Sequence, residues 1–234
     1  GAAQACAGRG MSARRFDAVL FDLDGTLVET SPEIADATND LLRELGLPQV
    51  SQSQVDAWIG HGTRELLVQA LAHVRQLPQE AVRADEAMPT IAAQFDRHYH
   101  RRCGTHSQLY PQVTQTLQQL RAQGVRVGVV TNKESRHTER VLAAHGLTVL
   151  LDIVISGDSL PTKKPNPADV FQCLQQWGVA PERALFVGDS RVDIATARNA
   201  GVAVWALPYG YNMGEPVANS HPDRMIDDIS ALLA

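Results

Sequence analysis

Short apolar runs that alternate with helix-like stretches constrain the fold of this chain most. A continuous apolar run of four to eight residues is typical of a strand that is buried on both faces, as in a parallel sheet. The runs are Ala18–Asp24, Val125–Val130, Val149–Ile155, Ala184–Val187 and Val202–Ala206, and the helical stretches are 113–123, 134–145, 168–177 and 192–200. Such alternation, with right-handed crossovers, predicts an α/β fold: a doubly wound, Rossmann-like parallel sheet.

The stretch from about residue 30 to residue 105 departs from this alternation and is helical throughout. Ser31 is the predicted N-cap of a first helix, with Pro32 at its first helical position. A second helix is predicted after Gly60–Gly62, and a third from Ala87 towards Tyr99. We therefore expect a helical cap domain, 30–105, inserted into a catalytic core formed by 11–29 and 106–234. Residues 1–10 are expected to be a tag remnant or a disordered terminus.

Composition excludes several classes of protein. The 234 residues have a formal net charge of −5, which disfavours a nucleic-acid partner because phosphate backbones attract basic surfaces. Three widely spaced cysteines favour a reducing compartment over a disulfide framework. Apolar runs of about 18 residues, which a membrane span requires, are absent from the sequence. We expect a cytoplasmic enzyme without nucleic-acid or membrane partners; a monomer and a homodimer both remain open.

Two aspartates close the first predicted strand. Asp22 and Asp24 point the same way because side chains alternate along a strand. Two neighbouring carboxylates repel each other unless a cation lies between them or one is protonated. This pairing suits a divalent metal beside a nucleophile and a proton donor. Turn chemistry, in which aspartate is common, is the alternative.

Three later predicted strands or helices also have polar residues at their ends. Thr131 and Asn132 end the second run and could hold phosphate oxygens, or Thr131 could cap the next helix. Lys164 precedes the helix from Ala168. The helix dipole disfavours a cation at this end unless an anion lies nearby, so the position indicates a bound anion or a neighbouring carboxylate. A solvated loop lysine is the alternative. Asp189 and Asp193 lie one helical turn apart, although helix capping would explain one of them. Carboxylates without histidine or cysteine favour Mg²⁺ over zinc.

Taken in order, these motifs resemble those of the haloacid dehalogenase superfamily with a small helical cap. The resemblance rests on Asp22–Leu27, Thr131, Lys164–Pro165 and Gly188–Asp193, and it covers about residues 16–233. The segments Val130–Lys133, Lys163–Pro167 and Tyr209–Gly214 add a similarity to one branch of that superfamily, bacterial phosphatases that act on 2-phosphoglycolate.

The resemblance implies a Mg²⁺-dependent phosphomonoesterase for a small phosphorylated acid, with 2-phosphoglycolate as the expected substrate. It makes Asp22 the nucleophile that forms an aspartyl-phosphate, and Asp24 the acid and base. It assigns the metal to Asp22, the backbone carbonyl of Asp24, Asp189 and, in support, Asp193. It assigns the phosphoryl oxygens to Thr131, Asn132 and Lys164.

Substrate recognition is expected in the cap. The loop 58–64 offers glycines, a helix N-terminus and a cation, so Arg64 and, less directly, His61 are candidate contacts for a substrate carboxylate. A solvated Arg64 is the alternative, since arginine is mostly exposed.

Other functions remain possible at this point: a phosphatase of another small metabolite, a sugar-phosphate mutase of the same superfamily, or a non-catalytic phosphate-binding module. Mutases of that superfamily carry Glu where this chain has Gly188, which weakens the second possibility.

Overall fold

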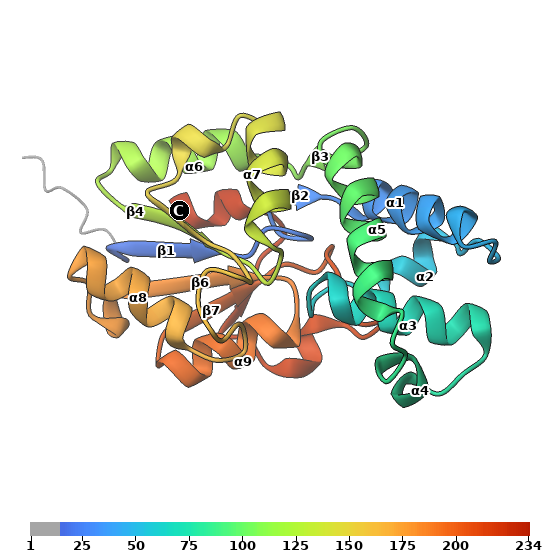
Figure 1. The fold of residues 1–234 in the computed structure, drawn as a ribbon. Coiled ribbons are helices and arrows are strands. Elements are labelled where there is room, and N and C mark those ends of the chain that lie inside the picture. Colours follow the sequence, from blue (N-terminus) through green and yellow to red (C-terminus); the bar gives the residue numbers. More distant parts are fainter. Residues whose placement is uncertain (1–14) are drawn as a thin grey trace, which may run out of the picture.

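The core of the molecule is a parallel six-stranded sheet with helices on both faces (Figure 1). The computed structural model describes residues 15–234, so the expectations for residues 1–10 and for Cys6 lie outside the described part. The strand order is β5-β4-β1-β6-β7-β8. The strands are β1 (Ala18–Phe21), β4 (Arg126–Val130), β5 (Ile153–Ile155), β6 (Ala184–Gly188), β7 (Ala203–Ala206) and β8 (Arg224–Met225). This confirms the predicted doubly wound α/β fold.

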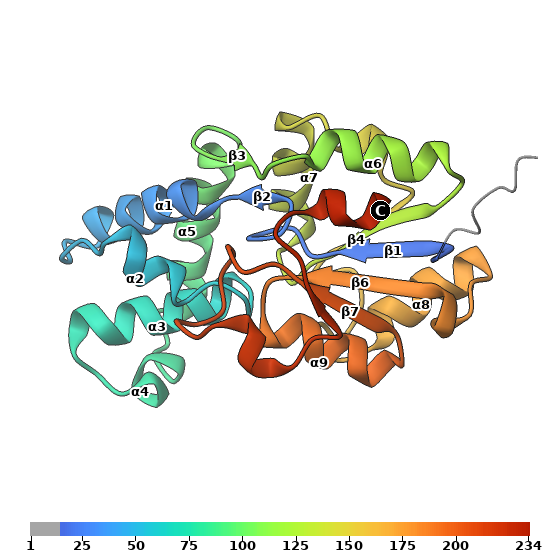
Figure 2. The ribbon, with the colours of Figure 1, turned by 180° about the vertical axis from the view of Figure 1, so that it is seen from behind.

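Two helical layers bury the sheet. Helices α6 (Val113–Ala122) and α7 (Ser135–Ala144) cover one face, and α8 (Ala168–Trp177) and α9 (Arg191–Ala200) cover the other (Figure 1). The C-terminal 3₁₀ turn, Ile229–Leu233, packs beside α6 (Figure 2). Strand β1 is fully apolar and buried because it lies at the centre of the sheet, between β4 and β6. The residues after these three strands are therefore brought to one place.

Five helices stand beyond the carboxyl ends of the strands (Figure 1). The longest two, α1 and α5, pack against each other. The chain enters and leaves this part through a short antiparallel ribbon, in which Val28 pairs with Leu109. The helices are α1 (Ser31–Glu44), α2 (Gln52–Asp56), α3 (Thr63–Arg75), α4 (Gln79–Arg83) and α5 (Met88–Arg102), and the ribbon strands are β2 (Val28–Glu29) and β3 (Gln108–Leu109).

Several local predictions were wrong in detail. Ser31 is the first residue of α1 rather than its cap, and Thr30 occupies the N-cap position. The predicted strand Val149–Ile155 contains a 3₁₀ turn, Thr148–Leu150, and is extended only from Ile153. Helices α2 and α4, of five residues each, were missed because a single helical turn shows no apolar periodicity.

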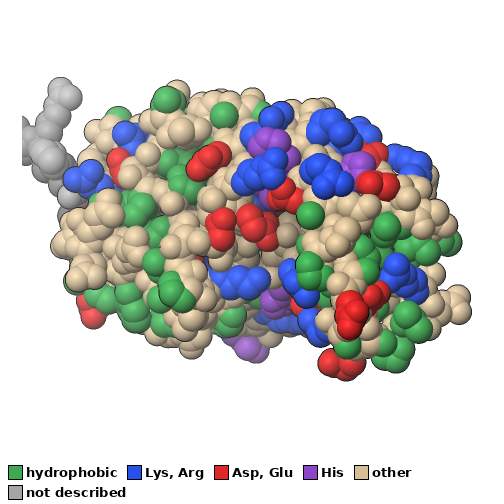
Figure 3. Space-filling model, in the orientation of Figure 1, with side chains coloured by type: hydrophobic (Ala, Val, Ile, Leu, Met, Phe, Trp, Pro, Cys, Tyr) green, Lys and Arg blue, Asp and Glu red, His purple; other side chains and the backbone are tan. Residues whose placement is uncertain are grey.

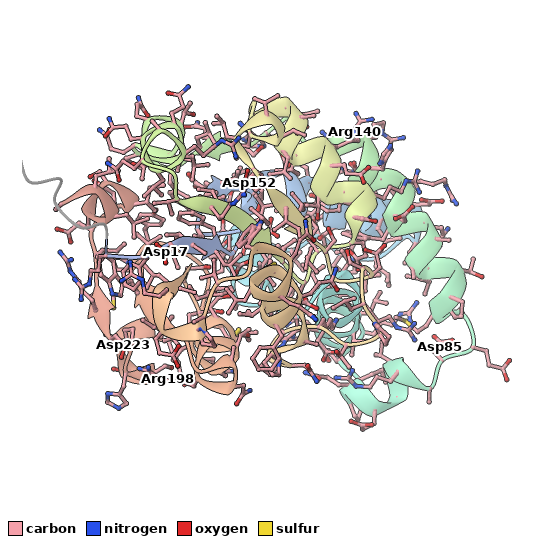
Figure 4. All side chains as sticks on the ribbon, turned by 90° about the vertical axis from the view of Figure 1, so that its left-hand side faces the viewer. Asp17, Asp85, Arg140, Asp152, Arg198 and Asp223 are labelled. Atoms are coloured by element: carbon pink, nitrogen blue, oxygen red, sulfur yellow. The ribbon has the colours of Figure 1, made fainter. Side chains whose placement is uncertain are left out.

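Acidic residues at the edges of the sheet have structural partners (Figure 4). Asp152 accepts a hydrogen bond from the backbone N–H of Val127 at 2.9 Å and pairs with Arg121 at 2.6 Å. Asp223 accepts one from the N–H of Val204 at 2.8 Å and pairs with Arg198 at 3.0 Å. These carboxylates anchor loops to strands, so only part of the chain's acidity belongs to a functional site. Across residues 15–234, every helix is too short or too polar to span a bilayer.

Candidate active site

The carboxyl ends of three adjacent strands assemble the site. Thr131 follows β4, Asp22 follows β1 and Asp189 follows β6. Parallel pairing in register aligns the ends of these strands, since Phe21 pairs with both Val129 and Val187. Ligands of open α/β sheets bind at this edge. The fold thus brings together residues that lie more than 160 positions apart in the sequence.

Asp22 lies beside the ammonium group of Lys164. The distance from Lys164 Nζ to Asp22 Oδ1 is 3.0 Å, and Oδ1 also accepts a hydrogen bond from the N–H of Leu23 at 2.7 Å. Among the described residues, Asp22 Oδ2 has no hydrogen-bond partner. Burial and, secondly, the charge of Asp193 raise the pKa of Asp22 to about 7, against an opposing effect of Lys164. One carboxylate oxygen is therefore held and the other is free to react.

Lys164 is shared between two carboxylates. Its Nζ lies 2.8 Å from Asp193 Oδ1, and the side chain is almost completely buried. Burial alone lowers the pKa of Lys164, but the charges of Asp193 and Asp22 outweigh it and raise the pKa above its usual range. Lys164 is therefore charged at every physiological pH, as a ligand for a phosphate oxygen requires.

Asp189 is fixed by the loops after β1 and β7, and Asp193 by its own helix and the end of β6. Asp189 accepts hydrogen bonds from the Thr26 hydroxyl at 2.7 Å and from the N–H of Tyr211 at 2.6 Å. Asp193 Oδ2 accepts the N–H of Asp189 at 3.0 Å and that of Ser190 at 3.3 Å, the latter as part of a capping box with Ser190. Burial, then repulsion from Asp22 and Asp193, raises the pKa of Asp189 well above its usual range.

Two glycines make room for these carboxylates. A Cβ at Gly25 would lie 2.1 Å from Asp189 Oδ2, and the φ of +82° at Gly25 also disfavours any other residue. A Cβ at Gly188 would lie 2.3 Å from the Asp193 carboxylate carbon. The turn after β1 and the end of β6 can thus carry only glycine without moving the acidic groups.

The acidic groups fit a divalent cation. Carboxylate oxygens of Asp22, Asp189 and Asp193 lie within 4.8 Å of one another, and one lysine balances these three buried groups. The raised pKa values of Asp22 and Asp189 show that their negative charge is incompletely compensated. Buried oxygen ligands of this kind suit a hard cation. The side chain of Asp24 is not part of this cluster, and a role of its backbone carbonyl stays a prediction.

Asp24 is held by residues that the sequence analysis did not single out. Lys133 Nζ lies 2.7 Å from Asp24 Oδ1, which also accepts a hydrogen bond from the Thr30 hydroxyl at 2.5 Å. The hydroxyl of Tyr99, on α5, contacts the same ammonium group. Burial alone lowers the pKa of Lys133, but Asp24 and weaker neighbours raise it overall. The sequence feature that could have identified Lys133 as a site residue is its position, two residues after Thr131.

Thr131 and Asn132, in the loop after β4, make different hydrogen bonds. The Thr131 hydroxyl accepts the N–H of Lys133 at 3.1 Å, and the next helix begins only at Ser135, after Glu134 at the N-cap. The capping alternative for Thr131 was therefore wrong. The Asn132 side chain accepts the N–H of Lys164 at 2.9 Å and donates to the carbonyl of Gly60 at 3.2 Å. Asn132 thus ties the lysine loop and the inserted helices to β4.

A cavity of about 50 Å³ lies between these residues and the inserted helices. Its core side is polar, and its cap side is mostly apolar. The lining residues are Asp22, Asp24, Ile34, Ile59, Gly60, Gly62, Thr63, Leu66, Phe95, Tyr99, Thr131, Asn132, Lys133, Asp189, Ser190 and Tyr211. A cavity needs roughly 10–15 Å³ to hold one water molecule, so this cavity accommodates only a small ligand.

Arg64 and His61 do not line this cavity, so their contact with a substrate stays a prediction. Arg64 is exposed, and both residues line a separate, open depression with Lys163. Lys163 Nζ donates to the backbone carbonyl of His61 at 2.8 Å. Lys, Arg and His side chains are visible on the surface along the junction of the two parts of the molecule (Figure 3). The helix α3 turns its first residues, Gly62 and Thr63, to the cavity and directs Arg64 outward.

The carboxylate cluster leads to a first prediction, on metal binding. Addition of millimolar Mg²⁺ to metal-free protein at pH 8 is expected to raise its Tm by several degrees, because the cation relieves repulsion in the folded state alone. The variant Asp189→Asn, which removes one ligand, is expected to lose most of this shift. The matched control Asp223→Asn, at an edge of the sheet, should retain it. Equal shifts in all three proteins would exclude this cluster as the metal site.

Comparisons with known proteins agree with the fold. Together these features are those of an α/β enzyme with a buried carboxylate centre. The sequence profile of the haloacid dehalogenase-like hydrolases matches residues 19–207, most of the chain. The protein belongs to that family, and it is a hydrolase.

Its relatives are similar along nearly their whole length. Phosphoglycolate phosphatase of Mannheimia succiniciproducens is 39% identical over 219 residues, covering 94% of this chain and 97% of the relative. The enzyme of the same name from Vibrio cholerae is 40% identical, with 92% and 94% covered. The crystal structure of a predicted phosphoglycolate phosphatase from Haemophilus somnus superposes with a TM-score of 0.87 at 38% identity, covering 94% of this chain and 97% of that one.

Proposed function

We propose that the protein is a Mg²⁺-dependent phosphatase that hydrolyses 2-phosphoglycolate to glycolate and phosphate through an aspartyl-phosphate. The observation that carries this proposal is the free oxygen of Asp22 beside Lys164, at the floor of a small cavity. The names of the relatives support the substrate. A relative of 25% identity, CbbY of Rhodobacter sphaeroides, has been crystallised with phosphate, which supports a phosphate site in this fold.

Asp22 performs the first step. Its Oδ2 attacks phosphorus, the bond from phosphorus to the ester oxygen breaks, and the phosphoryl group is left on the carboxylate. Lys164 and Thr131 bind the equatorial phosphoryl oxygens during transfer, and Asn132 keeps their two loops together. Asp22, Asp189 and the carbonyl of Asp24 would hold Mg²⁺, whose charge would offset the repulsion between a phosphate and the carboxylates. Asp193 fixes Lys164 and the loop after β6.

Asp24 moves the protons. It gives its proton to the departing glycolate oxygen, and the resulting carboxylate takes a proton from the water that attacks the aspartyl-phosphate. The phosphorus–Asp22 bond then breaks, which releases phosphate and restores the nucleophile. Thr30 and Lys133 hold the Asp24 side chain on the cavity side of the strand.

The inserted helices act as a cap in this proposal. We assign residues 30–105 to the cap and 15–29 with 106–234 to the core, because the β2–β3 ribbon marks the two crossings of the chain. The hydrogen bonds from Asn132 to the Gly60 carbonyl and from Thr63 to Glu134, the latter 2.6 Å long, hold the cap against the core. A closed cap excludes bulk water from the reacting groups.

Gly188 disfavours the alternative of a sugar-phosphate mutase. Mutases of this superfamily carry Glu at that position, whereas here any side chain would collide with Asp193. The small cavity also favours a two-carbon leaving group over a sugar. A phosphatase of another small acid remains the second candidate, since the phosphate-binding residues would be the same.

Phosphate release with Mg²⁺ tests the proposal directly. Among phosphoglycolate, sugar phosphates, nucleotides and pyrophosphate, we expect phosphoglycolate to have the highest kcat/KM, by at least tenfold. Chelation of the metal should abolish release, and readdition should restore it. Release from none of these esters would contradict the phosphatase proposal. A higher kcat/KM for another ester would contradict only the substrate.

A further inference from the structure

We propose that Lys133 forms a carboxylate-binding subsite on the leaving-group side of the cavity and thereby selects phosphate esters of small acids. This inference rests on the proposed function, because it concerns the group that leaves when phosphate is transferred. It assigns to Lys133 the role of substrate contact that the sequence suggested for Arg64.

The position of Lys133 within the cavity is the first argument. Among the described residues that line the cavity, Lys133 is the only lysine, arginine or histidine. It is buried, with 5% of the residue exposed, and its Nζ lies 2.7 Å from the group that protonates the leaving oxygen, Asp24. In glycolate the carboxylate carbon is only two bonds from that oxygen. A substrate carboxylate bound beside Asp24 is therefore within reach of the ammonium group.

The hydrogen-bonding capacity of Lys133 is the second argument. An ammonium group has three N–H donors. Within residues 15–234, its Nζ has two polar partners, Asp24 and the hydroxyl oxygen of Tyr99. One donor remains for a ligand in the cavity. The Tyr99 ring lies 4.7 Å from Nζ and fixes the ammonium group between the cap and the core.

The rest of the cavity wall on the cap side is apolar, so binding of a carboxylate there depends on the cation. Ile34, Ile59, Leu66 and Phe95 contribute hydrocarbon surface around the leaving group. A carboxylate buried against this wall without a cation would lose its hydration free energy, and no other interaction would replace it. Beside Lys133 it gains a charge-assisted hydrogen bond, whereas a neutral group of the same size gains none. The wall and the lysine together favour acids with short carbon chains.

Other cations near the cap do not meet these conditions. Arg64 is exposed and points to the open depression. Lys163 lines the same depression, where its Nζ is bound to the carbonyl of His61. Lys164 also lines that depression, but its Nζ lies between Asp22 and Asp193, where the phosphoryl group is expected.

Two esters of equal length separate the subsite from the rest of the site. 2-Phosphoglycolate and ethyl phosphate differ in one end group, a carboxylate in place of a methyl group. For the wild-type protein we expect the ratio of kcat/KM, acid over neutral ester, to be large. Lys133→Met should reduce this ratio by about 10- to 100-fold, the value of one hydrogen bond to a charged group. Both rates are expected to fall, because Lys133 also positions Asp24.

The ratio, rather than either rate, decides the outcome. If Lys133→Met lowers both rates but leaves the ratio at its wild-type value, Lys133 only positions Asp24 and the proposal is wrong. The controls Lys163→Met and Arg64→Met, which alter cations outside the cavity, should leave the ratio unchanged. A collapse of the ratio in Arg64→Met instead would place the carboxylate at Arg64.

A second variant covers the case in which Lys133→Met does not fold. Tyr99→Phe keeps the lysine and removes the oxygen that orients it, so the ratio should fall several-fold; an unchanged ratio would overturn the proposal. Equal hydrolysis of both esters by the wild-type protein would refute the carboxylate subsite and leave the phosphatase intact. If neither ester nor any other phosphate ester is hydrolysed, the proposed function itself fails.

Discussion

Asp22→Asn is expected to lower phosphate release by at least about 10⁴-fold, because an amide cannot take the role of the attacking carboxylate oxygen. The substitution preserves size, and Asn can still accept the N–H of Leu23 that Asp22 Oδ1 accepts at 2.7 Å. The measurement is release from 2-phosphoglycolate with Mg²⁺, together with circular dichroism to verify folding. Asp227→Asn, at an exposed position, is the matched control and should retain full activity. Activity within tenfold of wild type in Asp22→Asn would show that another group is the nucleophile.

The same variant should also be more stable than wild type in the absence of metal. In the folded protein the pKa of Asp22 is about 7, above its ordinary value of 3.8, because burial and Asp193 disfavour the charged form. The destabilising contribution of Asp22 is therefore absent below about pH 4 and grows as the pH rises to about 7. Asn carries no charge and avoids this contribution. The advantage of the variant in urea unfolding with a chelator should grow by about 2 kcal/mol between pH 5 and pH 8. An advantage that is independent of pH would contradict this origin.

The sequence predicted the core of the fold and the position of the site because both depend on local patterns. Buried strands such as β1 and β6 are continuous apolar runs, and parallel strands align their carboxyl ends. Polar residues directly after such strands therefore converge, as Asp22, Thr131 and Asp189 do. The sequence also predicts a boundary of the inserted helices near Glu29, because the alternation of strands and helices stops there.

The cap side of the site could not be predicted in the same way. Whether Arg64 or Lys133 faces the cavity depends on the angle at which α3 and α5 pack over the sheet, and this angle follows from side-chain packing among distant segments. Lys133 meets Tyr99, 34 positions away, and Asp24, more than 100 positions away. A lysine three residues after a strand is usually solvated, so nothing in the local pattern marks this one as buried.

The charge balance of the site explains how an acidic protein binds an acidic substrate. Within the cluster of Asp22, Asp189 and Asp193, one lysine is paired with Asp22 and Asp193, so a divalent metal would add the positive charge that a phosphate needs. Asp24 has a lysine of its own, Lys133. The two lysines therefore serve the two ends of the substrate in our proposals, the phosphoryl group and the carboxylate.

Removal of Lys164 is expected to have the opposite effect on stability from removal of Asp22. In Lys164→Met, the carboxylates of Asp22 and Asp193 lose the ammonium group that lies 3.0 Å and 2.8 Å from them. Breaking a buried ion pair by deleting one partner costs about 3–5 kcal/mol, because the other charge stays buried. Activity should fall by at least about 10³-fold, since a phosphoryl oxygen loses its cation in the transition state.

Lys163→Met is the matched control, because Lys163 is the neighbouring lysine but is exposed and bound to a backbone carbonyl. Its unfolding free energy should change by less than about 1 kcal/mol. Urea unfolding at pH 8 with a chelator measures all variants under one condition, and added Mg²⁺ should recover part of the stability of Lys164→Met. Asp22→Asn and Lys164→Met remove opposite charges from the same cluster, so electrostatics requires changes of opposite sign. Changes of the same sign would mean that packing, rather than charge, governs the stability of this site.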